Sequence, residues 1–235
     1  MIGNGAYVHT TPLPNPPNDA RALSSALRDI GFEVMEGIDL GRADMERIMR
    51  EFMIRASGAR TAILFYAGHG VQIDGRNYLV SVDTRFASAA DITSEMTEID
   101  TILAGLDDQI RTNIVILDAC RNNPMAQPAA AGPEAKRSLL VRSGLAAPSG
   151  LGKGATFGAG TLIAFATAPG QEALDGEGAN SPFSSALLRH VGTPKLEVQQ
   201  MLTRVRADVV AATKNKQVPW SNSSLLGEVY LADRP

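Results

Sequence analysis

Three short and almost wholly apolar runs constrain the fold more than any other feature of the sequence. They are residues 61–67 (TAILFYA), 113–118 (NIVILD) and 161–167 (TLIAFAT). Runs of this length without polar alternation are typical of strands that are buried on both faces of a sheet. Amphipathic segments separate them along the chain. The sequence therefore predicts an α/β domain whose mostly parallel sheet is covered by helices on both faces.

The remaining elements follow from periodicity and from turn and capping signals. Asn18 is expected to cap the first helix, and Ser181 with Pro182 to begin a later one. Asp74-Gly75 separates two short β-like runs, which is a strong hairpin signal. The other predicted helices cover 42–58 and 94–106 and begin at Thr193-Pro194, and short strands are expected at 32–36 and 228–232.

Composition excludes several function classes. The 235 residues carry a formal net charge of -3, so nothing favours nucleic acid or an anionic membrane surface. No apolar run reaches the roughly 18 residues of a membrane span. With a single cysteine and no N-terminal signal pattern, we expect a monomer in the cytoplasm; a targeting signal upstream of this sequence stays compatible with that view.

A histidine and the single cysteine both follow buried strands. His69 stands between two glycines after residues 61–67, and Cys120 follows residues 113–118. Because parallel strands bring their carboxyl ends to one edge of a sheet, the imidazole and the thiol are expected to meet there. An imidazole can accept the proton of a thiol and so create a nucleophile. A buried structural thiol beside a hydrogen-bonded loop histidine is the alternative.

The two motifs resemble those of a known family. FYAGHG (65–70) and LDACRNN (117–123) resemble the histidine and cysteine motifs of caspase-like cysteine peptidases, and Asp118 in the latter is similar to the pattern of bacterial metacaspase-like proteins (orthocaspases). The resemblance implies a three-layer sandwich with a mostly parallel six-stranded sheet. It also implies one peptidase domain over 1–235. Its parts would be a large-subunit-like part (1–126), a flexible loop or processing linker (127–160) and a small-subunit-like part (161–235). A passive disordered insert is the alternative for 127–160.

The resemblance also implies roles for the site residues. Cys120 would attack a peptide carbonyl, His69 would move the protons, and the N–H groups of Gly70 and Cys120 would stabilise the oxyanion. Asp19 and Asp118 would bind a basic side chain before the cut, which predicts cleavage of peptides and proteins after Arg or Lys. Helix N-terminal stabilisation by Asp19 and capping by Asp118 are the alternative readings. Ala67 stands where metacaspases usually have a pocket serine.

Three further interpretations stay open at this stage. Arg137, Arg142 or Lys153 would suit self-cleavage of the 127–160 segment. No cofactor and no metal are expected; calcium is a weak option, for which the acidic residues Asp83, Asp91, Asp100, Asp107 and Asp108 are available without a recognisable loop. The serious alternative to a peptidase is a catalytically silent caspase-like domain that serves as a protein-interaction module.

Overall fold

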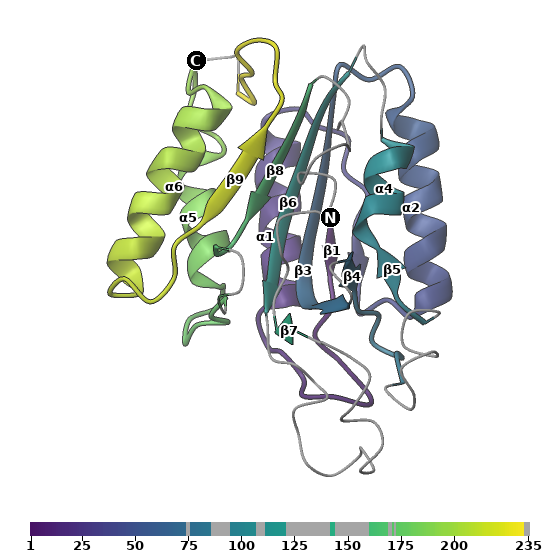
Figure 1. Ribbon diagram of the computed structural model, residues 1–235. Helices are drawn as coiled ribbons and strands as arrows, with labels where there is room; N and C mark the ends of the chain where they lie inside the picture. Colours follow the sequence, from purple (N-terminus) through teal and green to yellow (C-terminus); the bar gives the residue numbers. More distant parts are fainter. Residues whose placement is uncertain are drawn as a thin grey trace.

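A computed structural model of the chain describes residues 1–73, 76–85, 95–106, 111–120, 142–143, 160–168, 171 and 173–232. Its sheet has six strands on the main path, in the order β2-β1-β3-β6-β8-β9 (Figure 1). The strands are β1 (Ile2–Gly3), β2 (Gly37–Ile38), β3 (Thr61–Ile73), β6 (Thr112–Cys120), β8 (Thr161–Phe165) and β9 (Trp220–Ser223). All neighbours on this path are parallel except β8 and β9. The predicted mostly parallel sheet is confirmed, with six strands on its main path and three further short strands paired off this path among the described residues.

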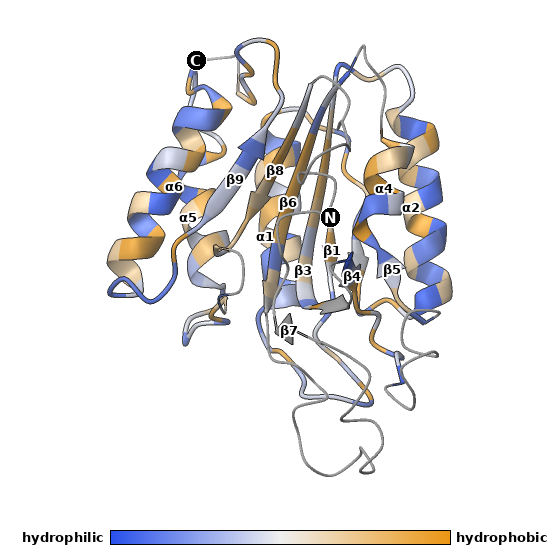
Figure 2. Ribbon diagram, in the orientation of Figure 1, coloured by the Kyte–Doolittle hydropathy of each residue, from blue (hydrophilic) through white to orange (hydrophobic). Residues whose placement is uncertain are grey.

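Helices cover both faces of this sheet, as the alternating pattern predicts. Figure 1 shows α1 (Pro16–Asp29), α5 (Pro182–His190) and α6 (Val198–Ala212) on one side, and α2 (Arg42–Ala56) and α4 (Ile99–Gly105) on the other. Consecutive residues of β3 serve the two layers: Phe65 belongs to the core under α1, α5 and α6, and Tyr66 to the core under α2 and α4. Both side chains are fully buried. The middle parts of the central strands are correspondingly apolar, with polar residues toward their ends (Figure 2).

The first residues of the helices show which capping signals in the sequence were sufficient to predict where a helix begins. Ser181 caps α5, since its side chain accepts a hydrogen bond from the Ser184 N–H. The capping role expected of Asn18 is wrong, because α1 already begins at Pro16 and the Asn18 amide donates to the Ala179 carbonyl instead. The last helix begins at Val198 rather than near Thr193, because the Glu197 carboxylate accepts the N–H groups that begin the helix.

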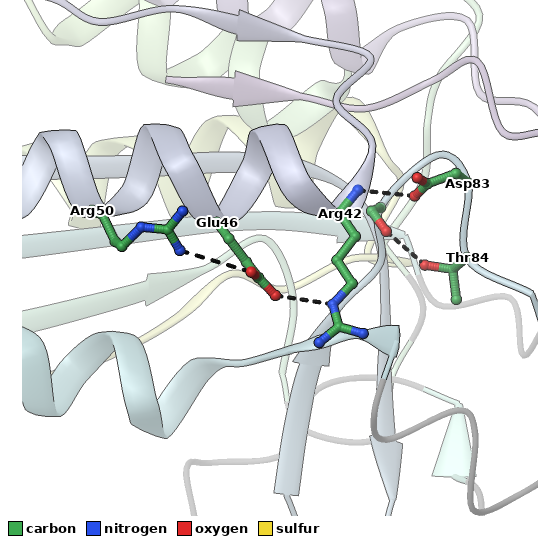
Figure 3. Close-up of polar contacts among 6 residues, drawn as sticks. Arg42, Glu46, Arg50, Asp83 and Thr84 are labelled. Carbon is green, nitrogen blue, oxygen red and sulfur yellow. Dashed lines mark hydrogen bonds and ion pairs between the residues drawn. The ribbon is translucent and has the colours of Figure 1, made fainter.

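The start of α2 is fixed by a residue distant in sequence. The backbone N–H of Arg42 donates to Asp83 Oδ1 at 2.9 Å, and Glu46 bridges Arg42 and Arg50 along the exposed face (Figure 3). Anionic groups are stabilising at helix N-termini, where N–H groups lack partners. Asp83, one of the acidic residues considered for calcium, is therefore engaged with a helix.

Two of the short strands were predicted in the wrong place. Residues 32–36 do not pair; β2 forms immediately after them. The run at 228–232 makes only one isolated bridge, between Tyr230 and Glu197, while the outer strand β9 forms at 220–223. The physical reason is tertiary: Val229 and Leu231 pack into the core under α1, α5 and α6.

The hairpin prediction is confirmed by the strands that flank it. Beyond the parallel part of the sheet, β3 pairs antiparallel with β4 (Arg76–Leu79), with Ile73 opposite Arg76. Asp74 and Gly75 themselves lie outside the described residues. Two shorter strands extend this edge, β5 (Thr97–Glu98) beside β4 and β7 (Arg142–Ser143) beside β3. Within the described helices, none is long and apolar enough to cross a membrane.

Candidate active site

His69 and Cys120 are direct neighbours across two parallel strands. The ladder between β3 and β6 runs from Thr61 opposite Thr112 to His69 opposite Cys120. Neighbouring strands lie about 5 Å apart. The sheet therefore brings both residues to one edge, at the lower end of the strands in Figure 1. The side chain of Cys120 lies outside the described part of the chain.

One detail of the expected placement is wrong. His69 does not follow the end of its strand, because β3 continues through it to Ile73. What ends near His69 is the parallel pairing: β1 pairs with β3 only as far as Ala67, and from Gly70 onward β3 pairs with β4. Gly70 thus lies directly after the histidine, opposite Leu79 in the hairpin.

The His69 ring is buried and oriented by one hydrogen bond. Its Nε2 lies 2.8 Å from the carbonyl oxygen of Thr11, and the residue is 1% exposed. A carbonyl oxygen can only accept, so Nε2 carries the proton in the neutral ring and Nδ1 is left with its lone pair. Nδ1 is buried and has no hydrogen-bond partner among the described residues. Burial lowers the pKa of His69, and the Thr11 carbonyl offsets this only in part. Such a ring can accept a proton at Nδ1.

Asp19 and Asp118 are brought together by the start of α5. The backbone N–H of Ser181 donates to Asp19 Oδ1 at 3.1 Å, and the Ser181 hydroxyl donates to Asp118 Oδ2 at 2.5 Å. Asn180 adds a bond of 2.8 Å to Asp19, and Ser184 one of 2.8 Å to Asp118. The alternative role of Asp19 at the helix N-terminus does not account for these contacts, since they reach across to the loop before α5.

The pair of carboxyl groups is electrostatically unfavourable when both are ionised. Burial, and next the charge of Asp118, raise the pKa of Asp19 to about 8. Burial likewise raises the pKa of Asp118, against the lowering effect of the Ser181 and Ser184 hydroxyl groups. Asp19 is 1% and Asp118 4% exposed. None of the ion pairs in the described part of the chain involves either residue.

A third carboxylate, Asp175, was missed by the sequence analysis. It lies in the loop before α5, where burial raises its pKa, and its charge in turn raises the pKa of Asp19 and of Asp118. The Asn15 amide holds this loop by donating to the Asp175 carbonyl at 2.6 Å. The signal available in the sequence was weak: an acidic residue in the segment ALDGEGANSPF, just before a capped helix.

Comparison with known proteins shows the family to which the chain belongs. Residues 1–230 match the family model described as a caspase domain. The chain belongs to the caspase-domain family. Two curated relatives are the mucosa-associated lymphoid tissue lymphoma translocation protein 1 of Homo sapiens and its homologue of Mus musculus, each 27% identical over 121 residues. The matched region is 52% of this chain and only 14% of either relative.

Asp118 receives its hydroxyl donors from the start of α5 and not from residue 67. Ala67, in the place of a metacaspase serine, is 1% exposed and lies opposite Asp118 in the ladder, within the core. Two serines of the α5 start, Ser181 and Ser184, donate to Asp118 instead. Sequence reasoning identified Ser181 only as a helix cap.

The other two histidines of the caspase domain are less buried than His69. His9 is exposed, and His190 at the end of α5 is 2.9 Å from Asp208, as expected for a surface histidine at a helix C-terminus. Within the described residues no cluster of three or more His, Cys, Asp or Glu side chains has the geometry of a metal site. Asp91, Asp107 and Asp108, named for calcium, and Arg137 and Lys153, named for self-cleavage, lie outside the described residues.

Proposed function

We propose that this caspase domain is a cysteine endopeptidase that hydrolyses peptide bonds after Arg or Lys. Cys120 is the nucleophile and His69 the acid–base residue. One observation carries the proposal: at one sheet edge His69 lies opposite Cys120, and the buried Asp118 lies two residues before Cys120. We assign Asp118 and the nearby Asp19 to an acidic pocket for the substrate. The curated relatives extend far beyond this chain, so the proposal concerns the domain alone.

The geometry around His69 suits the first step of acyl transfer. Nδ1 takes the thiol proton of Cys120, and the Thr11 carbonyl stabilises the resulting imidazolium through Nε2–H. The thiolate attacks the peptide carbonyl carbon, and the N–H groups of Gly70 and Cys120 stabilise the oxyanion. The amine leaves with the proton from His69. Water then attacks the thioester while His69 takes its proton, which releases the acid and restores the thiol.

The acidic pocket accounts for the substrate class. Asp19, Asp118 and the half-buried Asp175 bring three carboxyl groups together, and a bound guanidinium or ammonium group would favour their ionised forms and form charge-assisted hydrogen bonds with them. An acidic substrate side chain would add a further like charge. We therefore expect peptides and proteins with basic residues as substrates, and no cofactor is needed for the chemistry.

The test compares two reporter peptides that differ only in the residue before the cleaved bond, Arg in one and Asp in the other. The wild type should cleave the Arg peptide, and Cys120→Ala should lower kcat by roughly 10³-fold or more. Faster cleavage of the Asp peptide would refute the pocket assignment. Unchanged activity in Cys120→Ala would refute the nucleophile. A correctly folded wild type that cleaves neither peptide would favour the alternative, a silent interaction module.

A further inference from the structure

Two buried tyrosines hold the backbone of His69 from both sides. The His69 N–H donates to the Tyr7 hydroxyl at 2.7 Å, and the Tyr66 hydroxyl lies 2.8 Å from the His69 carbonyl oxygen. Tyr66 also reaches the Val80 carbonyl at 2.9 Å, and the two hydroxyl groups are 3.3 Å apart. Tyr7 is 5% exposed and Tyr66 is fully buried. The peptide groups of His69 are thus fixed by side chains as well as by strand pairing.

The Tyr7 ring also contacts the imidazole. The ring centroids of Tyr7 and His69 are 4.4 Å apart, with the planes inclined at 46°. Tyr7 and Thr11 belong to the same loop after β1, which the hydrogen bond from Leu13 N–H to the Gly5 carbonyl closes at 2.9 Å. One loop therefore supplies three contacts to His69. The Tyr7 hydroxyl accepts the His69 backbone N–H, the Tyr7 ring packs against the imidazole, and the Thr11 carbonyl accepts from Nε2.

Gly68 shows how closely the tyrosines approach. Its φ is +149°, and a Cβ atom there would lie 2.5 Å from the Tyr7 hydroxyl oxygen and 2.8 Å from that of Tyr66. Real Cβ atoms do not approach other atoms so closely, so any side chain at position 68 would displace both hydroxyl groups. The glycine before the histidine is explained by this arrangement.

We propose that Tyr7 is a positioning residue for His69: its hydroxyl fixes the His69 peptide, and its ring fixes the imidazole and shields it from water. Tyr66 supports it through the carbonyl side of the same peptide. This proposal rests on the proposed function in one respect, because the acid–base role of His69 is taken from it. Phenylalanine at position 7 would keep the ring contact and leave a buried N–H without its acceptor.

The first test is kinetic and uses the Arg reporter peptide. Tyr7→Phe should lower kcat about 10-fold, because small displacements of a catalytic group are costly, and leave KM nearly unchanged. The acidic pocket is built from α1, β6 and the loop before α5, so substrate binding is unaffected. Tyr230→Phe is the matched control, since the Tyr230 hydroxyl bonds to Glu228 on the surface. Wild-type kcat in Tyr7→Phe would overturn the proposal.

The second test needs no turnover. In a Cys120→Ala background, NMR titration of the three histidines gives the pKa of His69 directly. Tyr7→Leu removes the ring and should raise that pKa toward its ordinary value of 6.5, because water then reaches the imidazole. Tyr230→Phe should leave it unchanged. An unchanged His69 pKa in Tyr7→Leu would overturn the shielding role.

These readouts separate the two proposals. If the wild type cleaves no peptide, the proposed function fails, while the titration still decides whether Tyr7 shields His69. If Tyr7→Phe does not fold, Tyr66→Phe replaces it, with an expected loss in kcat of about threefold and an unchanged KM. A Tyr66→Phe enzyme with wild-type kcat would then count against the positioning role.

Discussion

The two halves of the candidate site are both buried, yet their polar groups have opposite surroundings. His69 is held by neutral groups: the Tyr7 and Tyr66 hydroxyls and the Thr11 carbonyl. In the acidic pocket, Asp19 and Asp118 are close enough for the charge of Asp118 to raise the pKa of Asp19. The neutral partners of His69 satisfy its peptide groups and Nε2, whereas ionisation of both Asp19 and Asp118 places two like charges in a buried environment.

The difference predicts opposite contributions to stability as the pH changes. The pKa of Asp19 is raised on folding, so its folded form holds the proton more tightly and stability falls as the pH rises from about 4 to about 8. The pKa of His69 is lowered on folding, so its contribution is lost as the pH falls below the ordinary value of 6.5. A substitution of Asp19 should therefore change stability on the alkaline side of the pH profile, and a substitution of His69 on the acidic side.

The largest effect is expected at Asp118, the central acceptor of the pocket. Asp118→Asn should lower kcat/KM for the Arg peptide about 100-fold, because it removes a buried charge partner of the substrate cation. The loss should appear mainly in KM, in contrast to the kcat effect of Tyr7→Phe. Steady-state kinetics on Asp118→Asn and Tyr7→Phe checks this. An equal loss in kcat for both variants would contradict the separate roles of the acidic pocket and of the His69 surroundings.

Asp19→Asn tests the acidic pocket through the thermal stability of the protein as well as through peptide binding. It should weaken binding of the Arg peptide about 10-fold and yet raise the Tm at about pH 8 by roughly 2–4 °C, since about 1 kcal/mol of repulsion and desolvation is relieved. The gain should shrink as the pH falls and vanish below about pH 3, where the carboxyl is protonated in both states. Thermal unfolding at both pH values checks it, with the exposed Asp29→Asn on the same helix as control. A lower Tm in Asp19→Asn at about pH 8 would contradict the strain assigned to the pocket.

The smallest effect is expected at Ser184. Ser184→Ala removes one hydroxyl donor to Asp118 and leaves the Ser181 donor, so KM for the Arg peptide should rise about threefold. The neighbouring, half-buried Ser185→Ala is the matched control for the loss of a hydroxyl group on α5. If both variants bind the peptide equally well, the hydroxyl of Ser184 does not shape the pocket.

Sequence patterns predicted the central sheet and the placement of His69 beside Cys120 at one sheet edge. Both predictions depend on the apolar runs of single strands, which are visible locally in the sequence. Buried strands reveal themselves by continuous apolar residues, and parallel strands fix which ends meet. Asp19 and Asp118 were named as pocket residues only through the resemblance of their motifs, and that role stays a prediction. Tyr7, Thr11 and Asp175 were missed, because each acts across a long sequence separation: 58 residues divide Thr11 from His69. The outer strand at 220–223 was missed for a related reason, since its polar residues have strand conformation only through pairing with β8.

The links between α1 and the loop before α5 join positions about 160 residues apart: Asn15 to Asp175, Asn18 to Ala179 and Asp19 to Asn180. Together with the ladder between β6 and β8, they tie the first half of the chain to the second without using the peptide bonds that connect Cys120 to Gly160. A scission anywhere in that connection would yield two fragments that stay assembled as one particle, with the acidic pocket still spanning both.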